Sequence, residues 1–174
     1  SFADRLEVGD HSPLKPSVRW RLASAHQSSS FGSGSGSRIV VAAAGLETGT
    51  VNMTTRVRCM GGYPFGGRIY RDWKAQGHGV MDVVDAIVDS CDVFFYTIGQ
   101  RLGIDVMAEF ADRFGLGHET GIELPSERTG IVPSTAWKTR VRNETWMPGE
   151  TISAAIGQGY TTVTPMQMTM VMAT

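Results

Sequence analysis

The sequence predicts a globular fold that is mostly helical, with one segment of loops and short strands. Hydrophobic residues recur at helical spacing in several segments from residue 38 onwards. Between them, residues 50–79 are rich in glycine and show no helical period. The chain has 174 residues, of which 41% are hydrophobic and 19% charged, which is ordinary for one domain with a hydrophobic core.

The first 37 residues differ from the rest. Residues 24–37 read SAHQSSSFGSGSGS, a Gly/Ser-rich composition that behaves as flexible chain and buries little surface. We therefore expect residues 1–37 to be an irregular, low-complexity segment and residues 38–174 to form the domain. The apolar run from Ile39 to Leu46 then predicts a buried helix that ends near Gly49.

A long apolar stripe at helical spacing follows the glycine-rich segment. It runs from Val80 to Leu102, and we expect a break in it near Ser90. Asp105 is expected to cap the next helix, which ends at Gly115. That helix is predicted to bury four residues, namely Met107, Phe110, Ala111 and Phe114.

Two further capping patterns lie in the last third of the chain. Ser134 is expected to cap a short helix that contains Trp137. Thr164 precedes a proline and stands three residues before Gln167, the pattern of a capping box. The chain ends at Thr174 inside this apolar helix, so we expect the domain to be incomplete.

Composition excludes several classes of function. There are 16 Lys and Arg against 17 Asp and Glu, a net charge of -1, so no overall basic surplus exists to bind nucleic acid or an anionic membrane. The longest apolar run is far shorter than the roughly 20 residues of a membrane-spanning helix. No signal peptide is visible, so we expect any anchor or export signal to lie outside these residues.

An ordered set of motifs provides the most specific signal. In chain order it comprises RDWK (71–74), GHG (77–79), SCDVFFY (90–96), FGLG (114–117), TGI (120–122), WMPGET (146–151), IGQGY (156–160) and TPMQ (164–167). In order and interval this set resembles the transpeptidase domain of the penicillin-binding protein 2 family, over residues 38–174. The resemblance implies an α+β, penicillin-binding protein/β-lactamase-like serine transpeptidase fold, present mainly as its helical part.

The family transfers acyl groups through a serine, and it carries the signatures S-x-x-K, S-x-N or S-x-D, and K-T-G. A serine hydroxyl needs a base to become nucleophilic, and a neutral lysine held close to it can serve. The second signature is identified here as Ser90-Cys91-Asp92. By resemblance, Ser90 relays protons and positions substrate.

The first signature departs from the family pattern. Counting back from the helix that ends near Gly49 puts the nucleophile at Ser35 and the lysine at position 38, which is Arg38. Arginine keeps its proton at any working pH and cannot act as the base. A literal S-x-x-K exists at Ser12 to Lys15, but its spacing to Ser90 does not fit the family. No K-T-G occurs in these 174 residues, since Lys138-Thr139 is followed by arginine.

The resemblance implies a peptidoglycan D,D-transpeptidase that is acylated by β-lactams at the periplasmic face of the bacterial inner membrane. The implied partners are the peptidoglycan stem peptide and a cell-wall glycosyltransferase, and no organic cofactor is implied. Arg38 and the missing K-T-G favour an inactive piece of such an enzyme. A non-catalytic scaffold or degenerate copy of the same fold remains an alternative, and a serine β-lactamase or β-lactam sensor domain is a weaker one.

The two cysteines are consistent with buried thiols, one disulfide bridge or metal ligands. Together with one histidine and one aspartate they supply a complete tetrahedral zinc set, namely Cys59, Asp72, His78 and Cys91. Family members can carry zinc next to the second serine motif. We therefore expect one structural zinc ion that ties the glycine-rich loops to the helix after Ser90. The alternative is a core thiol at Cys91, a loop thiol at Cys59 and solvated Asp72 and His78.

Overall fold

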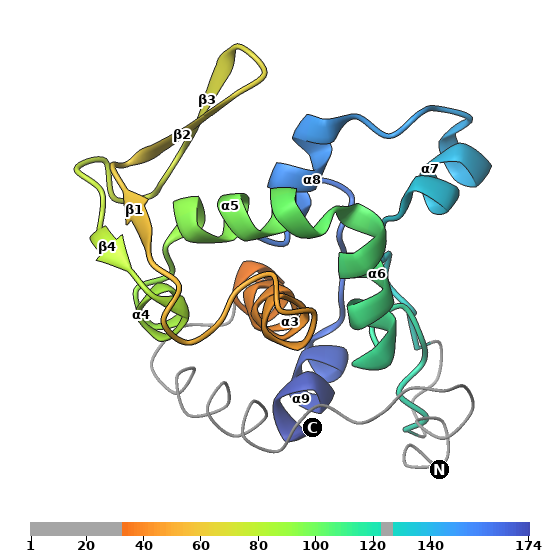
Figure 1. Cartoon of the computed structure of the whole chain (residues 1–174). Helices are drawn as coiled ribbons and strands as arrows, with labels where there is room; N and C mark the ends of the chain where they lie inside the picture. The colour runs from red at the N-terminus through yellow and green to blue at the C-terminus, as the bar shows by residue number, and fades with distance from the viewer. Residues whose placement is uncertain (1–32, 123–126) are drawn as a thin grey trace.

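The computed structural model describes residues 33–122 and 127–174, with the backbone only of Ser33 and Ser35. Helices form most of the structure, and two small antiparallel sheets lie to one side (Figure 1). The elements are α3 (Ser33–Glu47), β1 (Val57–Cys59), β2 (Gly62–Phe65), β3 (Arg68–Arg71), β4 (Gly79–Met81), α4 (Val83–Val88), α5 (Asp92–Leu102), α6 (Ile104–Arg113), α7 (Thr135–Arg142), α8 (Pro148–Ala154) and α9 (Pro165–Ala173). The α+β prediction is confirmed, and the expected helices occur in the expected order, but α8 was not predicted from the sequence.

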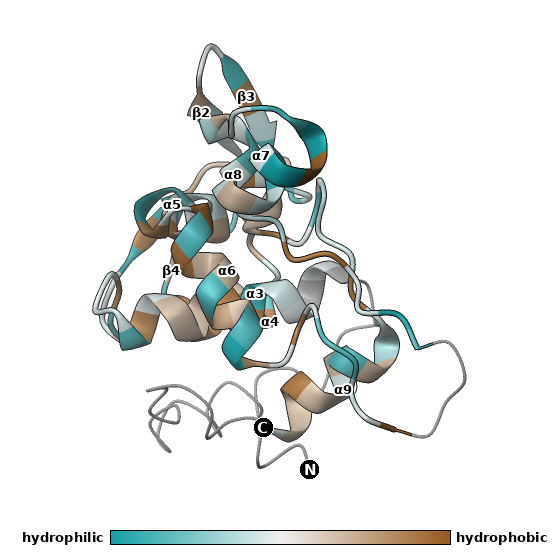
Figure 2. Ribbon diagram, turned by 90° about the vertical axis from the view of Figure 1, so that its right-hand side faces the viewer, coloured by the Kyte–Doolittle hydropathy of each residue, from teal (hydrophilic) through white to brown (hydrophobic). Residues whose placement is uncertain are grey.

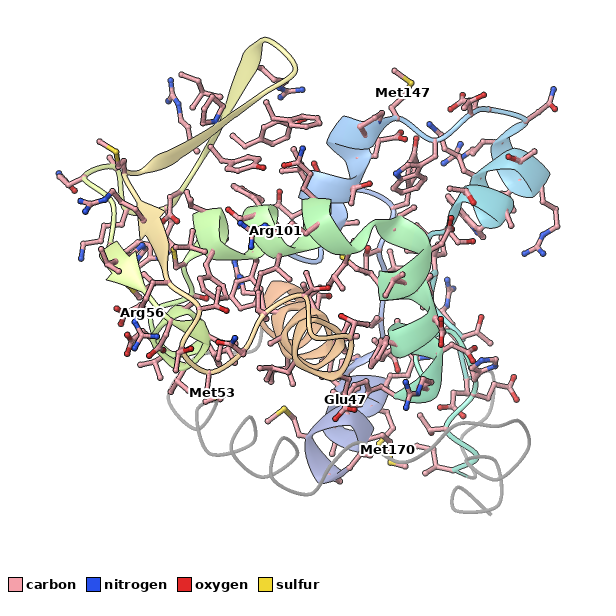
Figure 3. The ribbon with its side chains drawn as sticks, in the orientation of Figure 1. Glu47, Met53, Arg56, Arg101, Met147 and Met170 are labelled. Carbon is pink, nitrogen blue, oxygen red and sulfur yellow. The ribbon has the colours of Figure 1, made fainter. Side chains whose placement is uncertain are left out.

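The hydrophobic core surrounds α3, which packs against α4, α5, α6 and α9. Ala42, Ala43 and Ala44 are completely buried, and their small side chains allow the neighbouring helices to approach α3 closely. Phe94 and Phe95 on α5 are also fully buried, as expected for core residues. Exposed arginines such as Arg56 and Arg101 lie outside this core (Figure 3).

The first helix begins earlier than the sequence predicted. The irregular segment was expected to reach residue 37, but α3 already begins at Ser33. Gly36 explains the difference, because an added Cβ would lie 1.5 Å from the terminal methyl of Met168 on α9. Met168 on α9 thus packs directly against the backbone of α3 at Gly36, so this glycine lies in a packed helix and does not mark flexible chain. The rest of the expected N-terminal segment, residues 1–32, lies outside the described residues.

The predicted break in the long helical stripe is confirmed. Helix α4 ends at Val88, α5 begins at Asp92, and Ser90 lies in the connection. Ser90 has φ 56°, in the left-handed region that non-glycine residues seldom adopt. The start of the stripe differs from the prediction, because Val80 lies in β4 and pairs with Arg58 of β1.

The expected caps are confirmed at Ser134 and Thr164, whose side chains accept hydrogen bonds from the third residue of each helix. The cap predicted at Asp105 is wrong. Gly103 occupies that position, and Asp105 lies inside α6. Its carboxylate instead accepts hydrogen bonds from the N–H and hydroxyl of Thr135, at 2.9–3.0 Å. The side chain therefore connects α6 to the start of α7.

The hairpin of β2 and β3 is attached to α5 through aromatic side chains. Tyr63 and Tyr70 are paired across the hairpin, and both rings lie about 6 Å from the ring of Tyr96 on α5. The hydroxyl of Tyr96 also donates to the carbonyl of Arg71 at 3.2 Å. The remainder of the hairpin projects away from the helices (Figure 1). Within the described ranges, no helix combines the length and apolar character needed to cross a membrane.

Helix α7 is polar along most of its length (Figure 2), yet it contains one buried lysine. The Lys138 ammonium donates to both carboxylate oxygens of Glu150, at 2.7 and 2.9 Å, and to the carbonyl of Thr145 at 3.0 Å. Burial raises the pKa of Glu150, but hydrogen bonds from Lys138 and from the Met147 N–H outweigh it and lower that pKa overall. This contact connects α7 to α8.

The lowered pKa of Glu150 predicts a pH-dependent contribution to stability. The carboxylate stabilises the fold above its ordinary pKa of 4.5, and this contribution is lost as the pH falls through the lower folded value. We expect Glu150→Gln to reduce the free energy of unfolding at pH 7 and to have a smaller effect in acid. Urea unfolding at both pH values measures this. Glu144→Gln is the control, because Glu144 is more exposed and lies farther from Lys138, at 3.4 Å. An effect of Glu150→Gln that does not change with pH would contradict the assignment.

Candidate active site and metal centre

Three of the predicted site residues come together from separate elements. Arg38 on α3 donates from one guanidinium nitrogen to Ser90 Oγ at 2.9 Å and from another to Asp92 Oδ1 at 2.5 Å. Ser90 lies in the connection between α4 and α5, and Asp92 opens α5. The planar guanidinium spans both acceptors at once. The structure therefore brings position 38 of α3 beside the second serine motif.

Burial controls the electrostatics of this cluster. The side chains of Arg38 and Asp92 are 13% and 11% exposed. Burial raises the pKa of Asp92, and the hydrogen bond and charge of Arg38 oppose that increase. Burial and the nearby Asp92 carboxylate raise the pKa of Tyr96 to about 12. Because a guanidinium only donates hydrogen bonds, Arg38 holds Ser90 and Asp92 in place but cannot accept a proton.

Trp73 contributes to the geometry of Ser90, and the sequence reasoning did not assign it a role. Its indole N–H lies 3.1 Å from the carbonyl oxygens of both Asp89 and Ser90. These contacts support the left-handed backbone of Ser90, a conformation that costs of order 1–3 kcal/mol without support. The sequence feature that could have indicated this role is the position of Trp73 in the RDWK motif, directly after a predicted metal ligand.

The candidate nucleophiles remain expectations. Ser35 lies in the first turns of α3, three residues before Arg38, but its side chain lies outside the described residues. Ser12, with the literal S-x-x-K, also lies outside them. Lys138-Thr139 lies inside α7, and Lys138 binds Glu150.

The four predicted metal ligands converge from four segments of the chain. Cys59 ends β1, Asp72 follows β3, His78 precedes β4 and Cys91 precedes α5. One ligand atom from each lies within 4.8 Å of the others, slightly more than the spread of about 4 Å that zinc coordination demands. Cys59 and Cys91 are free thiols and buried, so the disulfide alternative is not found. Asp72 and His78 are also buried at their side chains, 0% and 1% exposed, so the solvated alternative is wrong.

The shortest distances between the side chains approach those around a tetrahedral ion, and both oxygens of Asp72 take part. Asp72 Oδ2 lies 3.4 Å from Cys59 Sγ and 3.6 Å from Cys91 Sγ. His78 Nδ1 lies 3.5 Å from Cys59 Sγ and 3.4 Å from Asp72 Oδ1. Sulfur and oxygen ligands around zinc lie about 3.5 Å apart at tetrahedral angles and usual bond lengths. The donor set of two thiolates, one imidazole and one carboxylate also suits zinc.

Electrostatics of the four residues are also consistent with a cation. Burial raises the pKa of Asp72, but hydrogen bonds from the backbone N–H groups of Lys74 and Val93 outweigh it, and the carboxylate stays ionised. Burial raises the pKa of the Cys91 thiol, and the carboxylate of Asp72 adds to the effect. A bound metal ion reverses this preference, since it replaces the thiol protons. Asp72 and Val93 connect the four residues to α5, directly beyond Ser90.

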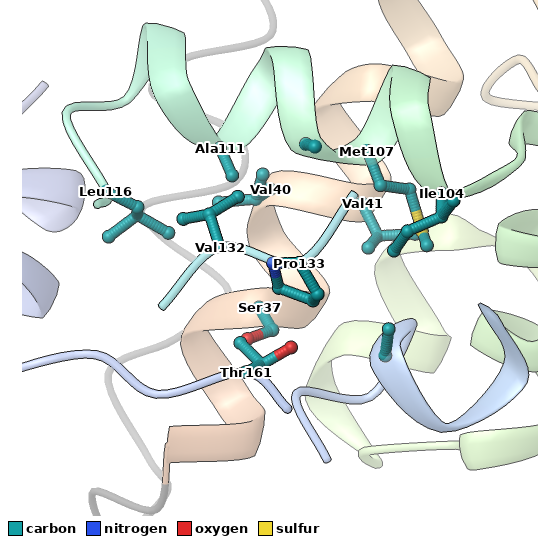
Figure 4. Close-up of a pocket in the computed structure, with 12 residues that line it drawn as sticks. Ser37, Val40, Val41, Ile104, Met107, Ala111, Leu116, Val132, Pro133 and Thr161 are labelled. Carbon is teal, nitrogen blue, oxygen red and sulfur yellow. The ribbon is translucent and has the colours of Figure 1, made fainter. Parts of the chain in front are cut away.

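An apolar cavity of about 40 Å³ lies between α3, α6 and the segment around Pro133 (Figure 4). Ser37 and Thr161 are its polar residues, and Val40, Val41 and Met107 are among the apolar ones. None of the seven residues of the two clusters lines it. The cavity is therefore separate from both clusters.

Residues 11–174 match the family model described as penicillin binding protein transpeptidase domain. The chain is 39% identical to the peptidoglycan D,D-transpeptidase MrdA of Acinetobacter baumannii, over 99% of this chain and 26% of that protein. It is 36% identical to MrdA of Escherichia coli K12, over 96% and 27% respectively. The chain thus spans about a quarter of the length of the curated relatives it matches.

Solved structures show the same similarity. Pseudomonas aeruginosa PBP2 in complex with WCK 5153 matches with a TM-score of 0.74 and 38% identity, over 77% of this chain and 31% of that one. Helicobacter pylori PBP2, in its complex with MreC, matches with a TM-score of 0.74 and 35% identity, over 77% and 25%.

The Arg38–Asp92 contact predicts a coupled loss of stability. Arg38→Met leaves a buried carboxylate without its partner, and we expect a cost of about 2 kcal/mol, below the roughly 3–5 kcal/mol of a fully buried pair, because both groups keep some exposure. The double variant Arg38→Met, Asp92→Asn is expected to cost less than the sum of the single changes. Urea unfolding of the four proteins measures the coupling. If the cost of the double variant equals the sum of the two single costs, the Arg38–Asp92 pair contributes nothing to stability.

Proposed function

The chain belongs to the penicillin-binding protein transpeptidase family, and we propose that its residues serve a peptidoglycan D,D-transpeptidase of bacterial cell-wall synthesis. The observation that carries the proposal is the position of Ser90 and Asp92 opposite residue 38 of α3. This proximity supports the roles that we propose, by family resemblance, for the second serine motif and for position 38. The identity to MrdA proteins over nearly the whole chain supports the same activity.

In the proposed reaction a serine hydroxyl, at Ser35 in this chain, attacks the carbonyl carbon of a stem-peptide amide. The terminal amino acid leaves with the amide nitrogen, and an amine of a second stem peptide then takes the acyl group from the serine. Both steps need a group that accepts the nucleophile's proton. Arg38 cannot supply it, so the chain with arginine at this position lacks the family's base.

A non-catalytic copy of the fold is the second candidate function, and the Arg38 contacts favour it. The guanidinium holds Ser90 and Asp92 together, so the architecture of the site is retained while its proton chemistry is lost. Such a protein would act as a scaffold in cell-wall synthesis.

We also propose that Cys59, Asp72, His78 and Cys91 hold one structural zinc ion. The ion would connect the loops around β1 to β4 with the start of α5, and it would take no part in proton transfer. Short interatomic distances, burial and the donor set support this assignment. Loops of this kind bury little surface by themselves, so a metal ion contributes directly to their folding.

The proposed location is the periplasmic face of the bacterial inner membrane, with a cell-wall glycosyltransferase as partner and β-lactams as inhibitors. One matching structure is described as a peptidoglycan synthase complex that coordinates polymerisation and crosslinking. That complex supports a polymerase partner for this chain.

Exchange of residue 38 tests the activity. We expect the 174-residue chain to form no covalent adduct with a fluorescent penicillin, because loss of a positioned base typically costs about 100- to 10,000-fold in rate. In a chimera, these residues replace the matching ones of Acinetobacter baumannii MrdA. We expect this chimera to be labelled slowly with Arg38, and faster by at least about 100-fold after Arg38→Lys. Gel fluorescence and mass spectrometry measure both.

A folded Arg38→Lys chimera that never labels would overturn the transpeptidase assignment. Rapid labelling of the Arg38 chimera would show that residue 38 is not the base. In either protein, acylation at Ser12 would relocate the nucleophile.

Elemental analysis tests the metal. We expect about one equivalent of zinc in the purified chain, and a lower unfolding temperature after removal by a chelator. Cys91→Ser removes a proposed direct ligand of the ion. Loss of an outer-shell partner costs roughly 10- to 100-fold in metal affinity, and we expect Cys91→Ser to weaken zinc binding by more than this. His118→Ala is the control, because His118 pairs with Asp112 at an exposed site. Protein that contains no zinc after growth with added zinc would exclude the site.

A further inference from the structure

Positive charge is concentrated in one segment of the chain. Residues 48–81 contain five of the 16 basic residues and one of the 17 acidic residues. The acidic residue is the buried Asp72. The basic residues are all exposed, namely Arg56, Arg58, Arg68, Arg71 and Lys74. A chain with a net charge of -1 therefore presents a local basic region on β1, β3 and the turn after β3.

Most of these charges have no acidic partner among the residues that the structure describes. Arg56 lies 3.3 Å from Asp82 and forms the one ion pair of the group within the described ranges. Arg68 lies over the ring of Tyr70, 5.0 Å from its centroid. Among the residues the structure describes, no carboxylate lies within ion-pair distance of Arg58, Arg68, Arg71 or Lys74. These four residues are called the basic surface below.

Apolar side chains are exposed beside the basic surface. Five of the eight large hydrophobic residues that are exposed in the described structure lie in the same segment, namely Met53, Met60, Ile69, Trp73 and Val80. Met60, Ile69 and Trp73 are 75%, 68% and 65% exposed. Ile69 directly follows Arg68 in β3, and Trp73 directly precedes Lys74. Exposed apolar groups next to charged ones indicate contact with a ligand or partner. A partner of this region therefore presents both anionic and apolar groups.

Backbone contacts hold this region in one shape. Asp72 donates its N–H to the carbonyl of Gly61 at 3.0 Å, so the start of the hairpin lies against the turn that follows it. Gly61 has φ 84°, and an added Cβ would lie 2.0 Å from the carbonyl oxygen of Ala75. The side chains are therefore presented on a supported backbone, and binding does not need to order the loops first.

The basic surface begins at the candidate active site. Lys74 follows Trp73, and the Trp73 indole N–H contacts the carbonyls of Asp89 and Ser90. From there the surface continues through Arg71 to Arg68 on the projecting β2–β3 hairpin (Figure 1). Asp85 and Asp89 on α4 are exposed, so the positive region ends at that helix.

We propose that the basic surface binds the carboxylates of peptidoglycan stem peptides, away from the bond that reacts. The inference rests on the proposed function, because it extends the substrate region of the same site. A peptidoglycan strand repeats its carboxylates along its length, so several weak ionic contacts act together. Its sugar rings and alanine methyl groups also offer apolar faces to Met60, Ile69 and Trp73. The ligand class is thus an acidic glycopeptide polymer.

Co-sedimentation with purified peptidoglycan sacculi tests the inference. The full chain should bind sacculi at low salt, and Arg58→Glu with Lys74→Glu should weaken binding by about tenfold. The matched control is Arg140→Glu with Arg142→Glu on α7, which makes the same change in net charge at another exposed site. Circular dichroism verifies that both double variants are folded. Equal loss of binding in both would show that only bulk charge matters, and it would overturn the proposal.

Two further arms identify the ligand. Sacculi whose carboxylates have been amidated should lose binding, and undiminished binding to them would overturn the proposal. Phosphatidylglycerol vesicles should bind less tightly than sacculi, and the opposite order would assign the surface to a bilayer instead. The assay needs no acylation. If the chain does not bind sacculi but the Arg38→Lys chimera is labelled, only this inference is rejected. If the chain binds sacculi but its Arg38→Lys chimera never labels, the proposed activity is rejected.

Discussion

The buried carboxylate of Asp72 is the interaction on which the functional region depends. It accepts hydrogen bonds from the N–H groups of Lys74 and Val93, and both cysteine sulfurs lie within 3.6 Å of one of its oxygens. These contacts join the turn after β3 to the start of α5. Since an unpaired buried charge is costly, the surrounding hydrogen-bond donors are what allow a carboxylate to lie there.

The position of Ser90 follows from that junction. Cys91 and Val93 contact Asp72, so the first turn of α5 is held in place directly after Ser90. Trp73, the neighbour of Asp72 in sequence, supports Ser90 from the other side. The four candidate ligand residues and the serine motif are therefore two parts of one structural unit, in which the turn after β3 positions Ser90.

Arg38 shows how geometry and chemistry can be separated in this fold. A guanidinium at position 38 reaches both Ser90 and Asp92, and it neutralises a carboxylate whose burial opposes ionisation. The same contacts remove the proton acceptor that serine acyl transfer needs. Arginine at position 38 is therefore compatible with the packing of α3 against α5, and it offers no proton acceptor there.

The sequence by itself determined most of the helix pattern, the break at Ser90 and the family, because hydrophobic spacing, caps and ordered motifs are local signals. The site residues remain its nominations. The sequence pattern placed the start of α3 too late. The glycine-rich start of this helix packs against Met168 at Gly36, and these two residues lie 132 positions apart in the sequence. Only the tertiary structure decided that Arg38 bridges Ser90 and Asp92, that four dispersed ligand residues converge, and that four basic side chains have no acidic partner among the described residues. Each of these depends on contacts between segments far apart in the chain, and no local pattern encodes them.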